Sequence, residues 1–198
     1  GTLLHALDPN LKIVMIEQLP DVAMESSDAL NNAGTGHAGY CELNYTPQDD
    51  SGHVAINRAL DINAAFEVSL QFWSALVKNG ALPAPQTFIN KTPHLSFVWG
   101  EQNVAFLKQR HQRLTQHHLF ADMQYSEDFA QLTQWMPLMM AERTATQPMA
   151  ATYVDYGTDV NFGALTKHLV AHLKTSANFT LLTDTRLSKL DKKSTGKY

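Results

Sequence analysis

The chain has 198 residues, 44% of them hydrophobic and 17% charged, which is typical of a globular protein with its own core. Its formal net charge of −4 argues against nucleic acid as a partner, because phosphate groups are bound by basic faces. The single cysteine, Cys41, excludes an intramolecular disulfide and indicates a reducing compartment such as the cytoplasm, and no apolar run reaches the ~18 residues that a membrane-spanning helix needs.

The first residues read as part of an α/β unit. Residues 2–7 predict the last turns of a helix, because Pro9 removes a backbone donor and stops the helix. Residues 11–17 are mostly apolar and end in Glu17, which predicts a buried strand with a carboxylate at its end. A helix, a short turn and a strand are what remains of a βαβ unit without its first strand, so we expect a chain that begins in mid-domain.

A long loop and a long helix follow. Residues 26–45 are rich in Ser, Asn, Gly and Thr and have no periodicity, which predicts a loop of functional importance. Residues 57–79 carry large apolar side chains three and four positions apart, a pattern typical of a helix with one face in a core. Gly80 is the expected end of this helix. The apolar stripe consists of Ile62, Phe66, Leu70, Trp73 and Val77.

Short strands and helices alternate in the rest of the chain. The strands predicted over residues 87–90 and 94–99 could also form one hairpin. The helix predicted over residues 129–136 ends because Pro137 follows it. Strands are predicted over residues 87–90, 94–99, 150–156 and 180–190. Helices are predicted over residues 102–116, 129–136 and 162–174.

This order of elements is α/β at both ends of the chain and mixed α+β between them. It indicates a nucleotide-binding domain that a second domain interrupts. We therefore predict a cofactor-binding domain made of residues 1–47 and 151–198, and a substrate or cap region made of residues 48–150.

Two features of the predicted cofactor domain indicate a nucleotide ligand. Glu17 ends a strand, where a carboxylate can accept hydrogen bonds from an adenosine ribose, although the confirming glycine fingerprint would precede Gly1. Residues 25–37 offer hydroxyls, amides and flexible backbone N–H groups, which can wrap phosphates and bind a flavin ring. Gly34 and Gly36 would let the backbone approach a flat ring closely. The alternative for Glu17 is a solvated surface carboxylate, and the alternative for residues 25–37 is an ordinary surface loop.

Longer strings of the sequence resemble the malate:quinone oxidoreductase family. Within residues 17–47 the matching strings include Glu25-Ser26-Ser27 and Asn31-Asn32-Ala33-Gly34-Thr35-Gly36-His37. Further matching strings are residues 71–73, 88–90, 93–101, 125–128, 137–140 and 157–163. The resemblance spans essentially the whole chain. The sequence departs from the family pattern at Asp28 and Leu30, where the pattern has Asn and Trp, and at Thr144-Ala145, which replaces Asp-Pro.

The resemblance implies an α/β protein with a partial Rossmann-like FAD-binding domain, interrupted by a mixed α+β cap domain as in D-amino-acid oxidase. It implies FAD-dependent oxidation of (S)-malate to oxaloacetate in the tricarboxylic acid cycle. Electrons would pass to a membrane quinone, and the full-length protein would lie in the cytoplasm, peripheral to the cytoplasmic membrane. Because the family is longer than this chain, the resemblance also implies a fragment cut at both ends and inactive by itself.

Carried over by position, the resemblance implies a cofactor role for the residues around the long loop. Glu17 would hold the FAD ribose, and Ser26 and Ser27 would lie near the pyrophosphate. The segment beside the flavin would contain Asn31, Asn32, Gly34, Thr35 and Gly36.

Malate oxidation needs a base for the hydroxyl proton and cations for two carboxylates. His37 and His94 are the candidate bases, since histidine titrates near neutral pH. Arg143 is the candidate carboxylate clamp, and Arg58 is a second arginine of the same kind. The alternative for each histidine is a purely structural role, and the alternative for each arginine is a solvated surface charge.

No metal site is predicted. His168 and His172 lie four residues apart on a predicted helix, but no third ligand stands nearby in the sequence, so a surface pair is expected. Two other functions stay open at this point: a related flavin-dependent 2-hydroxyacid oxidoreductase that acts on another dicarboxylate, and an inert structural fragment that lacks a complete FAD site.

Overall fold

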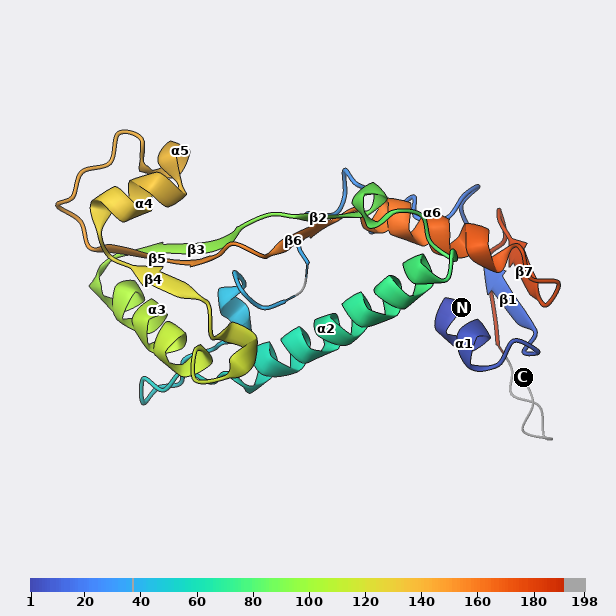
Figure 1. Ribbon diagram of the computed structural model, residues 1–198, viewed down its shortest axis with the longest axis horizontal. Coiled ribbons are helices and arrows are strands. Elements are labelled where there is room, and N and C mark those ends of the chain that lie inside the picture. The colour runs from blue at the N-terminus through green and yellow to red at the C-terminus, as the bar shows by residue number, and fades with distance from the viewer. Residues whose placement is uncertain (37, 191–198) are drawn as a thin grey trace. The chain divides into compact units, whose positions relative to one another are not determined.

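A computed structural model of the chain describes residues 1–36 and 38–190 (Figure 1). His37, one of the two predicted bases, lies outside the described residues. The chain forms two compact units. The first unit consists of residues 1–34, 73–89 and 160–198, and the second of residues 35–72 and 90–159. These boundaries differ from the predicted division at residues 47 and 150. The assignment of the two predicted regions as a cofactor domain and a cap region stays a prediction.

A parallel pair of strands organises the first unit. β1 (Ile13–Ile16) pairs with β7 (Phe179–Leu182), with Ile13 opposite Phe179. The two strands come from opposite ends of the sequence, which is the arrangement expected of an α/β domain that an insertion interrupts. The parallel pair here and the antiparallel sheet of the second unit confirm the predicted α/β fold with a mixed α+β insertion.

Two helices accompany the strand pair. α1 (Thr2–Leu7) ends as predicted, and it packs against α6 (Phe162–Leu173). α6 begins after Asn161, whose side-chain oxygen accepts a hydrogen bond from the backbone N–H of Ala164 at 2.9 Å. Such a cap satisfies a donor that the first turn of a helix leaves unpaired, so the start of α6 is well defined.

One face of the strand pair is exposed, and the prediction of a buried strand over residues 11–17 is wrong in this respect. Val14 is 59% exposed, Ile16 is 43% exposed, and Leu182, which lies opposite Ile16, is 41% exposed. Alternate residues of a strand point to opposite faces, so these side chains share one face. Parallel sheets are usually covered on both faces. The prediction fails because the described residues cover the other face only.

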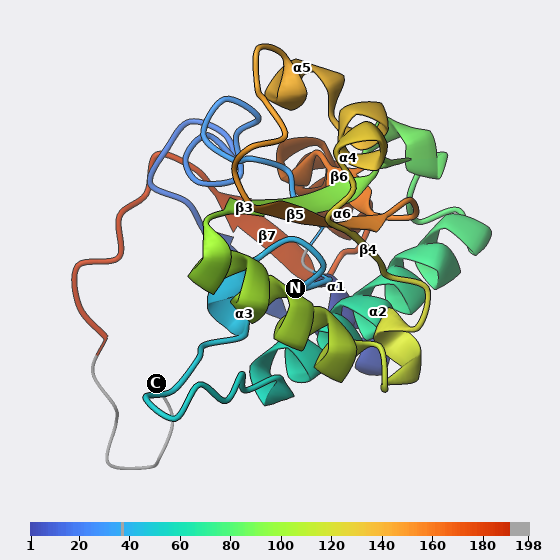
Figure 2. The ribbon, with the colours of Figure 1, turned by 90° about the vertical axis from the view of Figure 1, so that its left-hand side faces the viewer.

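A three-stranded antiparallel sheet forms the centre of the second unit, with β5 (Met149–Val154) between β3 (His94–Trp99) and β4 (Gln124–Ser126). α3 (Glu101–Leu114) lies on one face of this sheet, while α4 and α5 lie on the other (Figures 1 and 2). The bounds of these two helices are Phe129–Trp135 and Pro137–Met140.

Both faces of this sheet are packed, because successive residues of β5 point to opposite sides. Ala150 packs with Val98 and Leu107 on the α3 side. Ala151 packs with Leu132 and Met140 on the side of α4 and α5. The sheet is therefore the middle layer of a small core.

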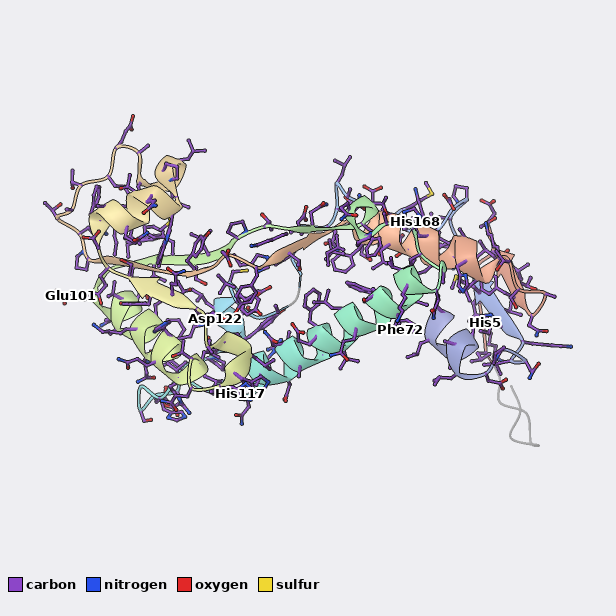
Figure 3. The ribbon with its side chains drawn as sticks, in the orientation of Figure 1. His5, Phe72, Glu101, His117, Asp122 and His168 are labelled. Atoms are coloured by element: carbon purple, nitrogen blue, oxygen red, sulfur yellow. The ribbon has the colours of Figure 1, made fainter. Side chains whose placement is uncertain are left out.

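α2 (Asn57–Lys78) is the long helix that the apolar stripe predicts. Gly80 follows its end with a φ of 74°, a left-handed conformation that glycine adopts without strain. Phe66 in the stripe is buried. The division between the two units falls within this helix, directly after Phe72, which is labelled in Figure 3.

The structure decides between two separate strands and one hairpin at residues 87–99. β2 (Ile89–Lys91) and β3 do not form a hairpin, because β2 pairs with β6 (Thr158–Val160) and β3 pairs with β5. The sequence does not predict β4 and β6, because they are too short for an alternating pattern to show. It does not predict α5 either, because Pro137 both ends α4 and occupies the first position of the next helix, where no N–H is needed. Short 3-10 helices lie at Leu43–Tyr45, Pro85–Thr87 and His118–Phe120.

Among residues 1–36 and 38–190, no helix combines the length and the apolar character that crossing a membrane requires.

The core of the second unit gives a test of stability. Leu107 is fully buried, so Leu107→Ala should lower the free energy of unfolding by about 2–5 kcal/mol through lost contacts and the cavity left behind. The matched control is Leu138→Ala, because Leu138 is 92% exposed and its truncation should change stability by less than about 0.5 kcal/mol. Urea denaturation followed by tryptophan fluorescence measures both; equal losses would contradict the packing described above.

Candidate functional site

A cavity in the first unit brings together three of the predicted cofactor residues. It has a volume of about 240 Å³, and Glu17, Ser26 and Ser27 all line it. Its walls come from the end of β1, from the segment that follows β1, and from α6. The full lining is Met15, Glu17, Leu19, Val22, Ala23, Met24, Glu25, Ser26, Ser27, Thr166 and Val170. The cavity thus combines one apolar wall with carboxylate and hydroxyl groups.

Glu17 sits where the strand ladder ends. Its backbone N–H donates to the carbonyl of Leu182 at 2.8 Å, which extends the β1–β7 pairing by one step. Its Oε1 accepts a hydrogen bond from the backbone N–H of Leu19 at 3.0 Å. In the described part of the chain, this is the one hydrogen bond made by the carboxylate, so acceptor capacity remains for a hydroxyl ligand in the cavity.

The loop that carries Ser26 and Ser27 is held in shape by two asparagine side chains. Asn31 donates from Nδ2 to the carbonyl of Glu25 at 3.2 Å, and Asn32 donates from Nδ2 to the carbonyl of Ser26 at 3.0 Å. The Oδ1 of Asn32 accepts from the backbone N–H of Gly34 at 2.8 Å. Both amides therefore close the loop on itself, and their predicted contact with a cofactor stays a prediction.

The first turn of α6 lies directly against this loop. A Cβ on Gly163 would come within 2.9 Å of the carbonyl oxygen of Ser27, so a larger residue here would force the loop away. Glycine at this position therefore lets α6 form one wall of the cavity that contains Ser26 and Ser27.

In the second unit, Gly36 makes a close backbone contact with the segment that contains β6. Its N–H donates to the carbonyl of Thr158 at 2.9 Å, and Thr35 next to it forms an isolated bridge with Asp159. A Cβ on Gly36 would lie 1.9 Å from the Oγ1 of Thr158 and 3.0 Å from the ring of Phe66. Only glycine fits here without a shift of its neighbours, so this position requires glycine for packing.

His94 is buried, and both of its ring nitrogens face protein groups. Nε2 lies 3.0 Å from the carbonyl oxygen of Thr158, which can only accept, so the proton belongs on Nε2. Nδ1 lies 3.8 Å from the Sγ of Cys41. A Cβ on Gly157 would come within 2.4 Å of the ring, so Gly157 allows the chain to pass over the imidazole. The contacts fix the ring, and the catalytic role of His94 stays a prediction.

Cys41, the partner of His94, is a thiol and not a thiolate at neutral pH. Burial raises its pKa to about 12, and the neighbouring Glu42 carboxylate adds to this effect. The backbone carbonyl of Cys41 accepts a hydrogen bond from the Oγ of Ser96 at 3.0 Å. Because the thiol keeps its proton, it can donate a weak hydrogen bond to Nδ1 of His94. This matches the tautomer with the proton on Nε2, which the carbonyl of Thr158 requires.

Arg143, the predicted carboxylate clamp, stacks on aromatic side chains of β3. Its guanidinium carbon lies 5.0 Å from the ring centre of Phe97 and 5.8 Å from that of Trp99. Its Nε donates to the carbonyl of Met139 at 3.0 Å. Arg58 makes a similar contact, 5.1 Å above the ring of Tyr45. Cation–π contacts of this kind leave the remaining guanidinium donors available, and both substrate roles stay predictions.

The histidine pair of α6 belongs to the first unit. His172 makes an edge contact with His5 of α1, with ring centres 6.4 Å apart. Figure 3 labels His5 and His168 on their helices. Within the residues that the structure describes, no three His, Cys, Asp or Glu side chains form a group suited to a metal ion.

Two buried polar residues are not predicted from the sequence: Asn63 of α2 and Arg110 of α3, each with no exposed surface. A lone arginine in a helix usually reads as a solvated residue. One signal could have identified it: Arg110 falls in the buried stripe of α3, which also contains Val104, Leu107 and Leu114.

Comparison with known proteins gives a consistent family. The model of the family described as malate:quinone oxidoreductase (Mqo) matches residues 1–198. A probable malate:quinone oxidoreductase of Methylobacillus flagellatus is 65% identical over 183 residues, which is 92% of this chain and 37% of the relative. One of Hahella chejuensis is 57% identical over 198 residues, 100% of this chain and 40% of the relative. The chain spans 36% to 40% of the length of such curated relatives.

Solved structures with the same fold are much more distant in sequence. The dithionite-reduced L-alpha-glycerophosphate oxidase of Mycoplasma pneumoniae with FAD bound has a TM-score of 0.60 and 13% identity, over 98% of this chain and 44% of that one. L-proline dehydrogenase from P. horikoshii has a TM-score of 0.52 and 11% identity, over 93% and 47%. At such identities the likeness shows the fold alone.

The contact at Gly36 can be tested by a double-mutant cycle. Gly36→Ala should destabilise the protein by about 1–3 kcal/mol, because the new methyl group overlaps the Thr158 hydroxyl. Thr158→Ala should itself be nearly neutral, since the buried Oγ1 has no hydrogen-bond partner in the described residues. The double variant should recover part of the loss, measured by thermal unfolding; strictly additive effects would contradict the proposed overlap.

Proposed function

Because the chain belongs to the malate:quinone oxidoreductase family, we propose that the full-length protein oxidises (S)-malate to oxaloacetate with FAD and passes the electrons to a membrane quinone. The observation that carries the proposal is the cavity of the first unit, where Glu17, Ser26 and Ser27 meet. The proposal includes a role in the tricarboxylic acid cycle and a cytoplasmic position, peripheral to the cytoplasmic membrane.

The residues of the cavity suit the adenosine and pyrophosphate part of FAD. Glu17 has a carboxylate oxygen that can accept hydrogen bonds from ribose hydroxyls, as at the end of the second strand of a dinucleotide fold. Ser26 and Ser27 offer hydroxyl donors that phosphate oxygens can accept. Gly163 supports this fit, because its missing side chain is what lets α6 lie against the Ser27 backbone.

The flavin end of FAD is assigned to the segment that continues this loop, namely Asn31, Asn32, Gly34, Thr35 and Gly36. In the described structure the two asparagines hold the loop backbone and Gly36 holds the β6 segment. We propose that these residues act on the flavin by shaping the backbone, since the side-chain amides of Asn31 and Asn32 each already donate to a carbonyl of the loop. His37 lies outside the described residues, and its role as a base rests on the resemblance.

Bound FAD would accept a hydride from C2 of malate. The chain must then supply a base for the hydroxyl proton and a cation for the substrate carboxylates. For the base we propose His37 or His94; His94 can accept a proton at Nδ1 once the weak contact with the Cys41 thiol is displaced. For the clamp we propose Arg143, whose position over Phe97 and Trp99 leaves donors for a carboxylate.

We further propose that this chain holds only part of the machinery. It spans 36% to 40% of the length of its relatives, so the remaining contacts to FAD, malate, quinone and membrane would come from other segments of a longer polypeptide. By itself the chain is then expected to purify without the visible absorbance of a flavin.

The reaction is tested with the full-length protein, purified with its bound flavin. Malate should reduce a quinone analogue or an artificial dye in its presence, whereas lactate and 2-hydroxyglutarate should support much slower reduction. Equal rates with all three substrates would favour a different 2-hydroxyacid oxidoreductase. Absence of flavin absorbance from the full-length protein would contradict the cofactor assignment.

The role of Glu17 is tested by FAD affinity. Glu17→Gln in the full-length protein should weaken FAD binding about tenfold, because a charge-assisted hydrogen bond to ribose becomes a neutral one. The control is Glu142→Gln, which alters an exposed carboxylate of the second unit. Titration of the apoprotein with FAD, followed by flavin fluorescence, gives both constants. Equal affinities in the two variants would exclude Glu17 from the cofactor site.

A further inference from the structure

Buried side chains of two helices bind a run of consecutive backbone carbonyls. Asn63 of α2 donates from Nδ2 to the carbonyl of Ala38 at 2.7 Å. Arg110 of α3 donates from Nη2 to the carbonyls of Gly39 at 2.8 Å and Tyr40 at 3.1 Å. Its Nε donates to the Oγ1 of Thr46 at 3.0 Å, so residues 38–46 are held at both ends. In Figure 3, α3 is the helix that begins at the labelled Glu101 and ends shortly before the labelled His117.

The conformation of Gly39 makes this double contact possible. Its φ of 69° is a left-handed conformation that turns the chain, so that two successive carbonyls reach the same Nη2 of Arg110. A Cβ on Gly39 would lie 3.3 Å from the carbonyl oxygen of Ala59, one helical turn before Asn63 on α2. The segment is therefore fixed between α2 and α3 by close packing as well as by hydrogen bonds.

The use of an arginine here has an energetic cost. Arg110 has no exposed surface, and none of the ion pairs found among the described residues involves it. Burial lowers the pKa of Arg110 to about 10, and the nearby Glu42 carboxylate offsets part of this effect, so Arg110 remains a cation at neutral pH. A buried cation costs desolvation free energy that an apolar side chain of similar size would not cost. Stability of the core alone therefore does not explain this residue, whereas directed donors to a loop do.

We propose that Arg110 and Asn63 are positioning residues for FAD: they fix the backbone of residues 38–40 and thereby the flavin-side segment that ends at Gly36. This inference rests on the proposed function, which assigns that segment to the flavin. A segment that is already ordered loses less conformational entropy when a ligand binds, so the clamp should raise FAD affinity. It should also fix the polar groups around the flavin and thereby its reduction potential.

A purely structural role predicts a different result, which makes the proposal testable. The decisive variant is Arg110→Met in the full-length protein, because methionine fills a similar volume without charge or donors. We expect an apoprotein with a lower melting temperature, because three buried acceptors lose their donor, together with FAD binding weakened at least about tenfold and a shifted flavin midpoint potential. Arg110→Lys, which keeps the charge with fewer donors, should recover part of the affinity. Lys108→Met is the control, since Lys108 is exposed on the same helix and should leave all three readouts unchanged.

The outcomes separate this inference from the proposed function. Arg110→Met with wild-type FAD affinity and potential would overturn the positioning role while the proposed function stands. If Arg110→Met does not yield folded apoprotein, Asn63→Ala decides, because it removes one donor only: weaker FAD binding supports the proposal and unchanged binding overturns it. A wild-type protein that binds no FAD overturns the proposed function and this inference with it.

Discussion

The parallel ladder between β1 and β7 is the interaction on which the first unit depends. It continues past the end of β1, because Glu17 donates to the carbonyl of Leu182 and accepts, through its own carbonyl, from the N–H of Thr185 at 2.9 Å. Leu19 accepts from the N–H of Asp184 at 3.1 Å. The segment after the strand is thereby anchored to the far end of the chain. This anchor helps to fix Glu17, which lines the cavity together with Thr166 and Val170 of α6.

In the second unit the corresponding constraint is the close approach of backbones. Gly36 meets Thr158, Gly157 passes over the ring of His94, and Gly39 turns beside α2, each in a space that a Cβ would fill. These contacts bring polar backbone groups into the interior, where each needs a partner. Buried side chains such as Arg110 and Asn63 provide those partners. Glycines and buried polar residues therefore act together. The glycines allow two backbones to approach closely, and the buried polar side chains form hydrogen bonds with the backbone groups that this approach buries.

Much of the fold was accessible to sequence reasoning because it depends on local patterns. The apolar stripe of residues 57–79 predicts α2 almost to its ends, and the order of elements predicts an interrupted α/β chain. The joint position of Glu17, Ser26 and Ser27 was accessible through resemblance, and the cavity brings them together. Strand partners were not accessible, since an apolar run such as residues 94–99 does not say which other strand completes its hydrogen bonds.

The sequence by itself determined where the long helices and the longer strands form, since side-chain spacing and the positions of proline and glycine act over a few residues. It also determined the family, because long strings of residues match at fixed spacing. Only the tertiary structure decided the role of single polar side chains. Arg110 has the residue type of a solvated cation, yet it lies in the core with its donors on the carbonyls of Gly39 and Tyr40. The reason is physical: burial and hydrogen-bond partners arise from contacts between distant segments, and a local pattern carries no information about them.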